Sequence, residues 1–539
     1  MKNRITLAIS ALFLSAMLAN AQTRYLDEVF TDAEISVVSN QVYGINFSQY
    51  VPASLGGPQL IPQFYDVYMP DPTVDSESAR PVIVYLHTGS FLPKGLASPM
   101  GEKTDSAAVE FCRRFARMGY VAISATYRVG WLANSTDLDL RRGTNLMAVY
   151  NAVQDAKACV RTLNGLQLGG GNPYETNMNH VALVGQGSGG YITFAYGALD
   201  NIQEVVGLSK FQYTQAGTGI YGNAVNANDP YVDVNLVGDW NGFGGQVTLT
   251  GNTTPLGLPE IDLTAVGRNY ENGAGLPDDV SVVVNMGGAM GDSTWLDAGE
   301  IPIISVHCRR DFFAPYYRGM VQVPVAGQFF PVVEVAGSHT AIKMADDFGN
   351  NSVFYNANFS DAITMKARNN QYNLGNYEAL LTFNIPAANP QLPFQVNSNP
   401  WDWWDPADPL GVNETNPNIK SQSMAYIDTV MGFITPRIAY IFKQDGLNVP
   451  GLGEEELNTV NENIKMFPNP ASELVTIQTT ADMISVMVLD LTGKEVATFA
   501  PGNKEFTMNV ENLRSGVYLV AVRTEEGTTF RRLSVTTQK

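Results

Sequence analysis

The sequence has 539 residues, enough for two or three domains, and carries a formal net charge of −19. A surface this acidic repels nucleic acid and anionic lipid, so neither is an expected partner. Hydrophobic residues make up 45% of the chain and charged residues 16%, which fits a globular protein with a large core.

Residues 1–21 have the pattern of a secretory signal peptide. Lys2 and Arg4 form a basic start, an apolar run extends from Ile5 to Leu18, and Ala19-Asn20-Ala21 offers a cleavage site. The run is shorter than the ~20 apolar residues that a membrane span needs. We therefore expect export through the inner membrane and no transmembrane span in the mature chain.

Residues 22–450 alternate apolar strand-like runs with helical segments. This alternation predicts an α/β domain with a mostly parallel sheet covered by helices. The expected helices include 107–119, 145–164 and a closing helix at 421–442. The expected strands lie within residues 80–89, 120–131, 180–190, 280–288, 301–308 and 330–337.

Two polar stretches interrupt this pattern. Residues 215–278 are rich in Gly, Asn and Asp and predict an insertion with short hairpins that could act as a lid. Residues 345–420 are irregular and contain Trp401, Trp403 and Trp404. These rings could stack on a carbohydrate, but we favour a loop fixed to the sheet edge by buried indoles.

The three cysteines are Cys112, Cys159 and Cys308. An oxidising compartment would permit one disulfide, between Cys112 and Cys159, and the alternative is three buried thiols. Cys and His show no metal-ligand spacing, so neither a metal nor a cofactor is expected.

The C-terminal part changes character. Residues 451–463 read as a linker, and residues 464–539 alternate apolar and polar positions with a period of two. This pattern predicts a small antiparallel β-sandwich.

Residues 181–199 read as a strand, a glycine-rich turn and a helix, which is the setting of a hydrolase nucleophile elbow, G-x-S-x-G. With Gly185 and Gly189 as the outer glycines, Gly187 takes the nucleophile position and Ser188 falls one place late. Glycine adopts the positive φ of the turn without strain but supplies no hydroxyl. The other register, with Ser188 as nucleophile between Gly187 and Gly189, would need Gln186 in place of the first glycine.

Three further positions could complete a site. The turn His87-Thr88-Gly89-Ser90-Phe91 could form an oxyanion hole from the N–H groups of Gly89, Ser90 and Ser188. Asp311 follows a strand and would orient a histidine, with Asp297 as the second candidate acid; a helix-capping role is the alternative for Asp311. His339 follows the strand that we expect to be the last of the sheet.

These motifs resemble carboxylesterase-type α/β-hydrolases. The segments that carry the resemblance occur in the family's order between residues 45 and 345: "YDVYMP", "PVIVYLHTGSF", "GYVAISATYRVGW", "QDAKACVRTL", "GQGSGGY", "IPIISVHCRRDFFAPY" and "AGSH". The resemblance implies the fold and a nucleophile–acid–histidine order. It does not imply activity, because fold does not establish function. Thr88 stands where the family has glycine.

The C-terminal segment resembles the sorting domain of type IX (Por) secretion cargo. The matching residues are Phe467-Pro468-Asn469-Pro470-Ala471, Asp490-Leu491-Thr492-Gly493-Lys494 and Leu513-Arg514-Ser515-Gly516-Val517-Tyr518. The resemblance implies that residues 464–539 contact the type IX machinery and that the protein reaches the cell surface or the medium. The alternative is a β-sandwich that binds sugar or protein.

Three functions follow from this organisation. The favoured one is an exported carboxylesterase-like protein without a working serine, which binds a ligand or partner in the hydrolase cleft. The second is an active serine esterase that uses Ser188, His339 and Asp311. The third is a structural surface protein for which the fold is only a scaffold.

Overall fold

The computed structural model describes residues 23–51, 56–96, 100–254, 257–325, 328–385, 398–403, 419–450, 464–490, 494–524 and 527–536. The predicted signal peptide and the predicted linker at 451–463 lie outside these ranges. The chain divides into two compact units, Met1–Val449 and Pro450–Lys539. Within the described residues, no helix combines the length and the apolar character needed to cross a membrane.

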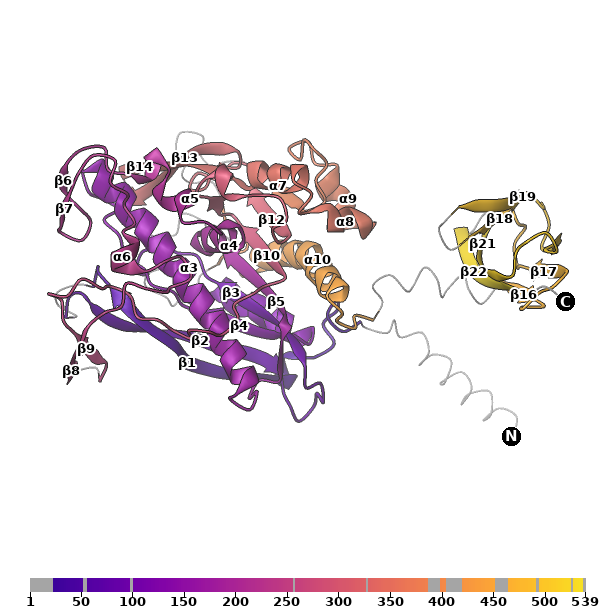
Figure 1. Ribbon diagram of the computed structural model, residues 1–539, viewed down its shortest axis with the longest axis horizontal. Coiled ribbons are helices and arrows are strands. Elements are labelled where there is room, and N and C mark those ends of the chain that lie inside the picture. The colour runs from indigo at the N-terminus through magenta and orange to yellow at the C-terminus, as the bar shows by residue number, and fades with distance from the viewer. Residues whose placement is uncertain are drawn as a thin grey trace. The chain divides into compact units, whose positions relative to one another are not determined.

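The first unit is built on an eight-stranded sheet (Figure 1) with the order β1-β2-β4-β3-β5-β10-β12-β15. β2 pairs antiparallel with β1 and β4, and the remaining pairs are parallel. The strands are β1 (Ile35–Ser48), β2 (Gln59–Pro70), β3 (Arg80–Leu86), β4 (Val121–Ala125), β5 (Thr176–Gln186), β10 (Val282–Met286), β12 (Ile303–Cys308) and β15 (Leu380–Phe383).

Helices cover both faces of this sheet. Every residue of β3 and β4 is buried, as expected for central parallel strands. Tyr85 of β3 stacks on Phe111 of α2 (Ser106–Arg117), whereas Val283 of β10 lies against Gly197 of α4 (Ser188–Ala198). The strand register places these two contacts on opposite faces. The prediction of a mostly parallel, helix-covered α/β sheet is confirmed.

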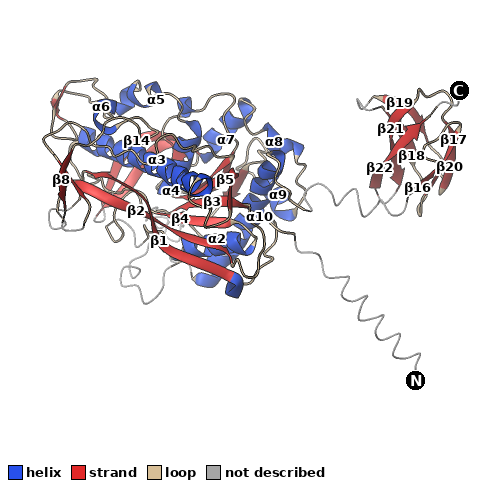
Figure 2. Cartoon of the chain, turned by 60° about the horizontal axis from the view of Figure 1, so that its bottom comes forward, coloured by secondary structure: helices blue, strands red, loops and turns tan. Residues whose placement is uncertain are grey.

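Two long helices complete the layers (Figure 2). α3 (Leu138–Leu168) packs against α4, while α10 (Lys420–Gln444) is joined to α2 by the ion pair between Arg114 and Asp428. The shorter helices are α5 (Gln203–Val206), α6 (Val234–Val237), α7 (Ser338–Asp347), α8 (Ser352–Asn356) and α9 (Ala362–Arg368), and the 3-10 turns are Asp32–Glu34, Ser209–Phe211 and Ser293–Trp295.

The strand predicted within 330–337 is in a different place from the one expected. It forms β14 (Gln328–Gly337), which pairs antiparallel with β13 (Arg318–Val325) and β11 (Ala289–Met290) in a separate three-stranded sheet. The last strand of the main sheet is β15, a four-residue strand inside the stretch that the sequence presents as irregular. The prediction that 330–337 ends the main sheet is therefore wrong.

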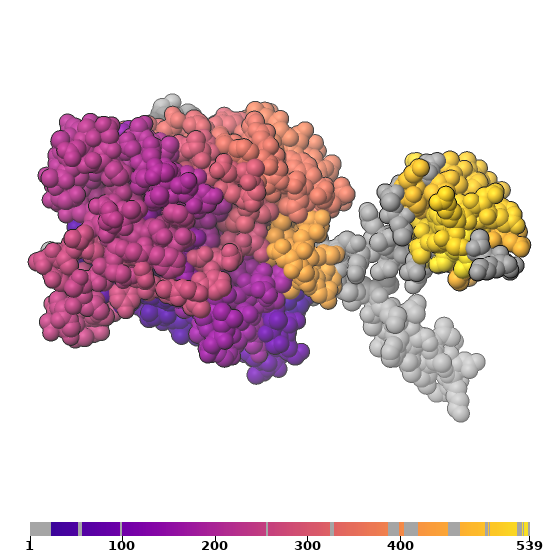
Figure 3. All heavy atoms as spheres, in the orientation of Figure 1, coloured from indigo at the N-terminus to yellow at the C-terminus, as the bar shows by residue number. Residues whose placement is uncertain are grey.

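The insertion at 215–278 contains two short hairpins, as expected. They are β6 (Gly217–Thr218) with β7 (Ala224–Val225), and β8 (Leu249–Thr253) with β9 (Pro259–Ile261). Ile261 packs with Phe47 of β1 and Leu60 of β2, so the second hairpin lies along the edge of the main sheet. In Figure 3, the part of the insertion that carries β6 to β9 forms the surface at the left of the first unit. Its role as a lid stays a prediction.

Two smaller expectations concern cysteine and tryptophan. All three cysteines are free and buried, so the structure has the thiols of the second alternative and no disulfide between Cys112 and Cys159. Trp401 is fully buried and packs against Phe383 of β15, which agrees with an indole that fixes a loop to the sheet edge. Trp404 lies outside the described residues.

The second unit is an antiparallel β-sandwich. One sheet has the order β16-β17-β20 and the other β19-β18-β21-β22. Buried residues of both sheets, including Val475, Ile477, Val486 and Val488, form one core of their own. The strands are β16 (Lys465–Phe467), β17 (Leu474–Gln478), β18 (Ser485–Leu489), β19 (Glu495–Phe499), β20 (Glu505–Asn509), β21 (Gly516–Thr524) and β22 (Gly527–Val535).

Candidate functional site: a hydrolase elbow without a serine

Gly187 occupies the tip of the turn between β5 and α4. Its backbone has φ 55° and ψ −113°, and its N–H donates to the Met286 carbonyl at 2.8 Å. Residues other than glycine rarely adopt this backbone conformation, because their Cβ atom crowds the backbone, whereas glycine adopts it freely. The structure therefore has the sharp strand-to-helix bend of a nucleophile elbow, with a glycine at its tip.

The two outer glycines allow the bend to pack closely. A Cβ atom on Gly185 would lie 2.0 Å from the Gly189 carbonyl oxygen, and one on Gly189 would lie 2.1 Å from the Leu86 carbonyl oxygen. No side chain fits at either position. The spacing of Gly185, Gly187 and Gly189 thus follows from steric requirements of the turn.

Thr88 fills the space that a nucleophile side chain would need. A Cβ atom built on Gly187 would lie 2.1 Å from Thr88 Oγ1 and 3.0 Å from Thr88 Cβ. Thr88 follows β3, and its position opposite the elbow could not be read from the sequence. The departure of Thr88 from the glycine of the resembling family was the available signal.

Ser188 is buried, and the side chain that its hydroxyl contacts is a phenol. It is 4% exposed, and its Oγ lies 2.8 Å from the hydroxyl of Tyr127. Tyr127 donates its own proton to the His87 carbonyl at 2.8 Å, so Ser188 is the donor toward Tyr127. Burial raises the pKa of Tyr127, which keeps the phenol neutral. A neutral phenol does not remove a proton from serine. The sequence analysis did not identify Tyr127 as a residue of the site.

The predicted oxyanion loop lies next to the elbow. Gly89, Ser90 and Phe91 all have positive φ, at 129°, 56° and 56°. The Ser90 carbonyl accepts from Trp131 Nε1 at 2.9 Å, and the Phe91 carbonyl accepts from the Gly130 N–H at 2.8 Å. The loop after β4 therefore holds this unusual backbone in place.

Asp311 follows β12, the next-to-last strand of the main sheet, as the resemblance implies. Its Oδ1 accepts from the N–H groups of Phe313 at 2.8 Å and Ala314 at 3.0 Å. Its Oδ2 lies 3.6 Å from Nε2 of His307, which is on β12 itself. Burial raises the pKa of Asp311 to about 7 and lowers that of His307 to about 4. Here Asp311 caps its own turn, which is the alternative role considered from the sequence.

His339 is near the start of α7, after β14. It is 8% exposed, and its ring packs against Tyr316, Tyr317 and Tyr377. Burial lowers its pKa, and its Nε2 has no hydrogen-bond partner among the described residues. Within the residues that the structure describes, no hydrogen bond or ion pair joins His339 to Asp311 or to Ser188. The structure does not connect the three predicted catalytic side chains to one another.

The position of His339 also differs from the expected one. The expectation rested on its following the last strand of the sheet, but that strand is β15. The sequence contains no histidine after residue 339, so none can follow β15. Asp297, the second candidate acid, is exposed, and its carbonyl accepts from Asn350 Nδ2 at 2.7 Å.

A segment after β15 returns to the elbow strand. The Asp402 carboxylate accepts from Gln186 Nε2 at 2.8 Å on both oxygens, and Tyr85 donates to Gln186 Oε1 at 2.6 Å. Asp402 stands between Trp401 and Trp403 in the tryptophan cluster. The cluster therefore helps to fix the residue that precedes Gly187.

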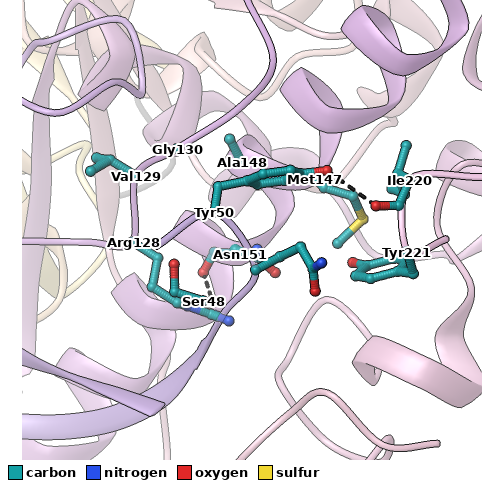
Figure 4. Close-up of a pocket in the computed structure, with 11 residues that line it drawn as sticks. Ser48, Tyr50, Arg128, Val129, Gly130, Met147, Ala148, Asn151, Ile220 and Tyr221 are labelled. Carbon is teal, nitrogen blue, oxygen red and sulfur yellow. Dashed lines mark hydrogen bonds between the residues drawn. The ribbon is translucent and has the colours of Figure 1, made fainter. Parts of the chain in front are cut away.

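A pocket lies beside residues 128–130, in the loop that follows β4 (Figure 4). It is enclosed by the end of β1, residues 128–130, α3 and the segment between β6 and β7. Tyr127 contacts Ser188, and the next residue, Arg128, lines this pocket. Among the described residues, no cluster of His, Cys, Asp and Glu is arranged to hold a metal ion.

The strand order and the glycine-tipped bend at the end of β5 define the first unit as an α/β-hydrolase fold. Residues 465–536 match the family described as "Secretion system C-terminal sorting domain", so the second unit is a sorting domain.

Several solved structures are similar to parts of the chain. One is PorZ, a surface component of the type IX secretion system of Porphyromonas gingivalis, at 25% identity, with 15% of this chain and 12% of PorZ covered and a TM-score of 0.14. Another is esterase B from Lactobacillus rhamnosis, at 19% identity, with 38% and 51% covered and a TM-score of 0.21. A third is the butyrate-bound esterase Est2 of Thermogutta terrifontis, at 13% identity, with 51% and 75% covered and a TM-score of 0.26.

The chain thus spans about half of the Lactobacillus esterase and about an eighth of PorZ. No curated protein matches it.

Proposed function

We propose that this chain is a pseudoenzyme: an exported, carboxylesterase-like protein of the cell surface or the medium that binds a ligand or partner and lacks serine-esterase activity. The observation that carries the proposal is the pairing of Gly187 with Thr88, because the nucleophile position has no hydroxyl and its space is filled from the opposite loop.

Two further observations support this proposal. The hydroxyl of Ser188 is hydrogen-bonded to a neutral phenol, and within the described ranges His339 has no hydrogen bond or ion pair with Asp311. An esterase needs a base within hydrogen-bond reach of its nucleophile, at about 2.6–3.2 Å. Loss of the nucleophile typically reduces kcat by about 10⁶.

The sorting domain supports delivery to the cell surface or beyond. The predicted signal peptide would provide the first step, through the inner membrane, and contact of residues 464–539 with type IX machinery would provide the second. Deletion of residues 464–539 should leave the protein on the inner side of the outer membrane. Surface protease accessibility of the full chain and of the deleted chain measures this.

The test of the missing activity uses the purified chain with short-chain nitrophenyl esters and a fluorophosphonate probe. We expect hydrolysis at the rate of the Ser188→Ala and His339→Ala variants, and no phosphonate adduct at Ser188 by peptide mass spectrometry. An adduct at Ser188 whose formation is lost in His339→Ala would establish the alternative, an active esterase that uses Ser188, His339 and Asp311.

A further inference from the structure

Arg309 and His339 lie against the same two tyrosines. Arg309 directly follows β12, and His339 is near the start of α7, which packs on β12 (Figure 1). The centroid of the Tyr317 ring lies 4.8 Å from Arg309 Cζ and 4.8 Å from the centroid of the His339 ring. For Tyr316 both distances are 5.6 Å. The fold thus brings a guanidinium and an imidazole to one aromatic cluster.

The guanidinium of Arg309 has no counterion in the described part of the chain. Its Nε is buried without a hydrogen-bond acceptor, and no carboxylate there forms an ion pair with it. Its two terminal nitrogens have no protein acceptor among the described residues either, and they reach the solvent. By contrast, the buried Arg128 pairs with Asp155 at 2.9 Å. Because partly buried cations are normally paired or hydrogen-bonded, Arg309 is available to pair with an anion.

The charge around this cluster is positive, although the whole chain carries a net charge of −19. Burial, and then the charges of Lys343 and Arg309, lower the pKa of His339, so its imidazole is neutral at pH 7. Lys343 forms an ion pair with Asp347. The charge of Arg309 is left uncompensated, and a single positive charge matches a monoanion.

The surroundings of Arg309 favour a carboxylate that carries an apolar part. A planar guanidinium can donate two parallel N–H bonds to a planar carboxylate. Tyr372 adds a third ring, with its centroid 5.5 Å from Arg309 Cζ. Tyr317 and Tyr372 are half-buried, and within the described residues their hydroxyls make no hydrogen bond. Their rings can therefore contact the apolar part of a ligand that is held at the guanidinium.

We infer that Arg309, with Tyr317 and Tyr372 beside it, binds the carboxylate of a small monoanion whose apolar part packs on the tyrosine rings. The inference rests on the proposed function, a protein that binds a ligand, and names the chemical class of that ligand. It involves neither Gly187 nor Ser188.

The test titrates the full mature chain with benzoate, with the neutral benzamide and with phenyl phosphate, by calorimetry or ligand-observed NMR. We expect saturable binding of benzoate and at least about tenfold weaker binding of benzamide, which cannot form a charge-assisted pair. Phenyl phosphate, a dianion at pH 8, should bind more weakly than benzoate, because a single positive charge is left to compensate it.

Two variants at position 309 separate charge from shape. Arg309→Gln removes the charge and should weaken benzoate binding at least about tenfold, and Arg309→Lys keeps the charge without the planar fork and should weaken it about threefold. Arg310→Gln is the matched control, since Arg310 is the next residue and is exposed, and it should bind like the unmodified chain. Equal losses in Arg309→Gln and Arg310→Gln would indicate a general charge effect and overturn the inference.

The ring signals of His339 give a readout that needs no variant at position 309. The chain has four histidines, which NMR can resolve. Bound benzoate should shift the His339 signals and raise the pKa of His339, because the ligand offsets the charge of Arg309, whereas His180 on β5 should not respond.

Absence of saturable benzoate binding, equal affinity for benzamide, tighter binding of phenyl phosphate, or unmoved His339 signals would each overturn the inference. None of these outcomes alters the phosphonate result at Ser188, so this inference and the proposed loss of esterase activity can fail separately.

Discussion

Thr88 Oγ1 lies 2.1 Å from the position that a Cβ atom would take on Gly187. One residue belongs to the loop after β3 and the other to the tip of the elbow, and they are 99 positions apart in the chain. The two positions share one side-chain volume, which threonine at position 88 already fills. Any change at one of them is therefore coupled to the other.

The first prediction concerns this coupling. Gly187→Ser alone should lower the free energy of unfolding by about 1–3 kcal/mol, because the new side chain overlaps Thr88. Thr88→Gly in the same chain should recover much of that loss. Denaturant unfolding of the two single variants and the double variant gives the coupling energy, expected at about 1–3 kcal/mol. Additive effects would show that the two positions do not compete for space.

The second prediction concerns Ser188 and Tyr127. Ser188→Ala should reduce the free energy of unfolding by about 0.5–1.5 kcal/mol, because it removes the buried hydrogen bond to Tyr127, and Tyr127→Phe should cost more, because it removes that bond and the one to the His87 carbonyl. The double variant should cost less than the sum of the two. If Ser188 were instead a nucleophile held away from Tyr127, the two effects would add.

The third prediction is a dependence of stability on pH at Asp311. Burial raises the pKa of this carboxyl to about 7 from 3.8, so the folded state favours the protonated form. The stability that Asp311 contributes is complete below pH 3.8 and is lost as the pH rises to about 7. Asp311→Asn keeps an oxygen for the N–H groups of Phe313 and Ala314 and does not titrate.

We therefore expect the Tm of Asp311→Asn, relative to that of the unmodified chain, to be higher at pH 8 than at pH 5. Asp311→Ala is the control, since it removes the acceptor and should lower the Tm at both pH values. The contribution of His307, whose pKa is lowered to about 4, is complete above pH 6.5 and is lost as the pH falls to about 4, but His307 is present in both chains and acts on both Tm values. A Tm difference that does not grow from pH 5 to pH 8 would argue against a neutral Asp311.

The fourth prediction concerns the independence of the two units. The second unit has a closed core of its own, in which Ile477 of β17 is fully buried. Ile477→Ala should destabilise this unit by about 2–5 kcal/mol. In calorimetry, only one of two unfolding transitions should move. Ile303→Ala, in β12, is the matched change and should move only the other. A single shared transition that responds to both variants would contradict independent folding.

Much of the fold follows from sequence patterns. Long buried runs such as β3 and β5 are recognisable because central parallel strands are apolar on both faces. The sequence places residues 330–337 in the main sheet, because an apolar run that ends in glycine has the same pattern in a parallel sheet and in an antiparallel hairpin. In the structure these residues belong to β14 of the separate three-stranded sheet. β15 was missed because four residues are too few for a periodic signal.

Only part of the candidate site could likewise be predicted from the sequence. The backbone of the elbow could be predicted from the positions of Gly185, Gly187 and Gly189, because each glycine meets a local steric requirement. The contact of Thr88 with Gly187 and the bond between Ser188 and Tyr127 depend on tertiary packing across several strands. The role of His339 was inferred from its order in the chain, and that order was misleading once β14 proved to lie outside the main sheet.

The shared volume at positions 88 and 187 also bears on evolutionary reversal. A lineage that carried this pair and gained serine at 187 first would meet a steric barrier, and one that lost threonine at 88 first would gain no reaction. Under the proposed function, a return to hydrolysis requires both changes, at 88 and at 187, so the present pair resists reversal by single steps.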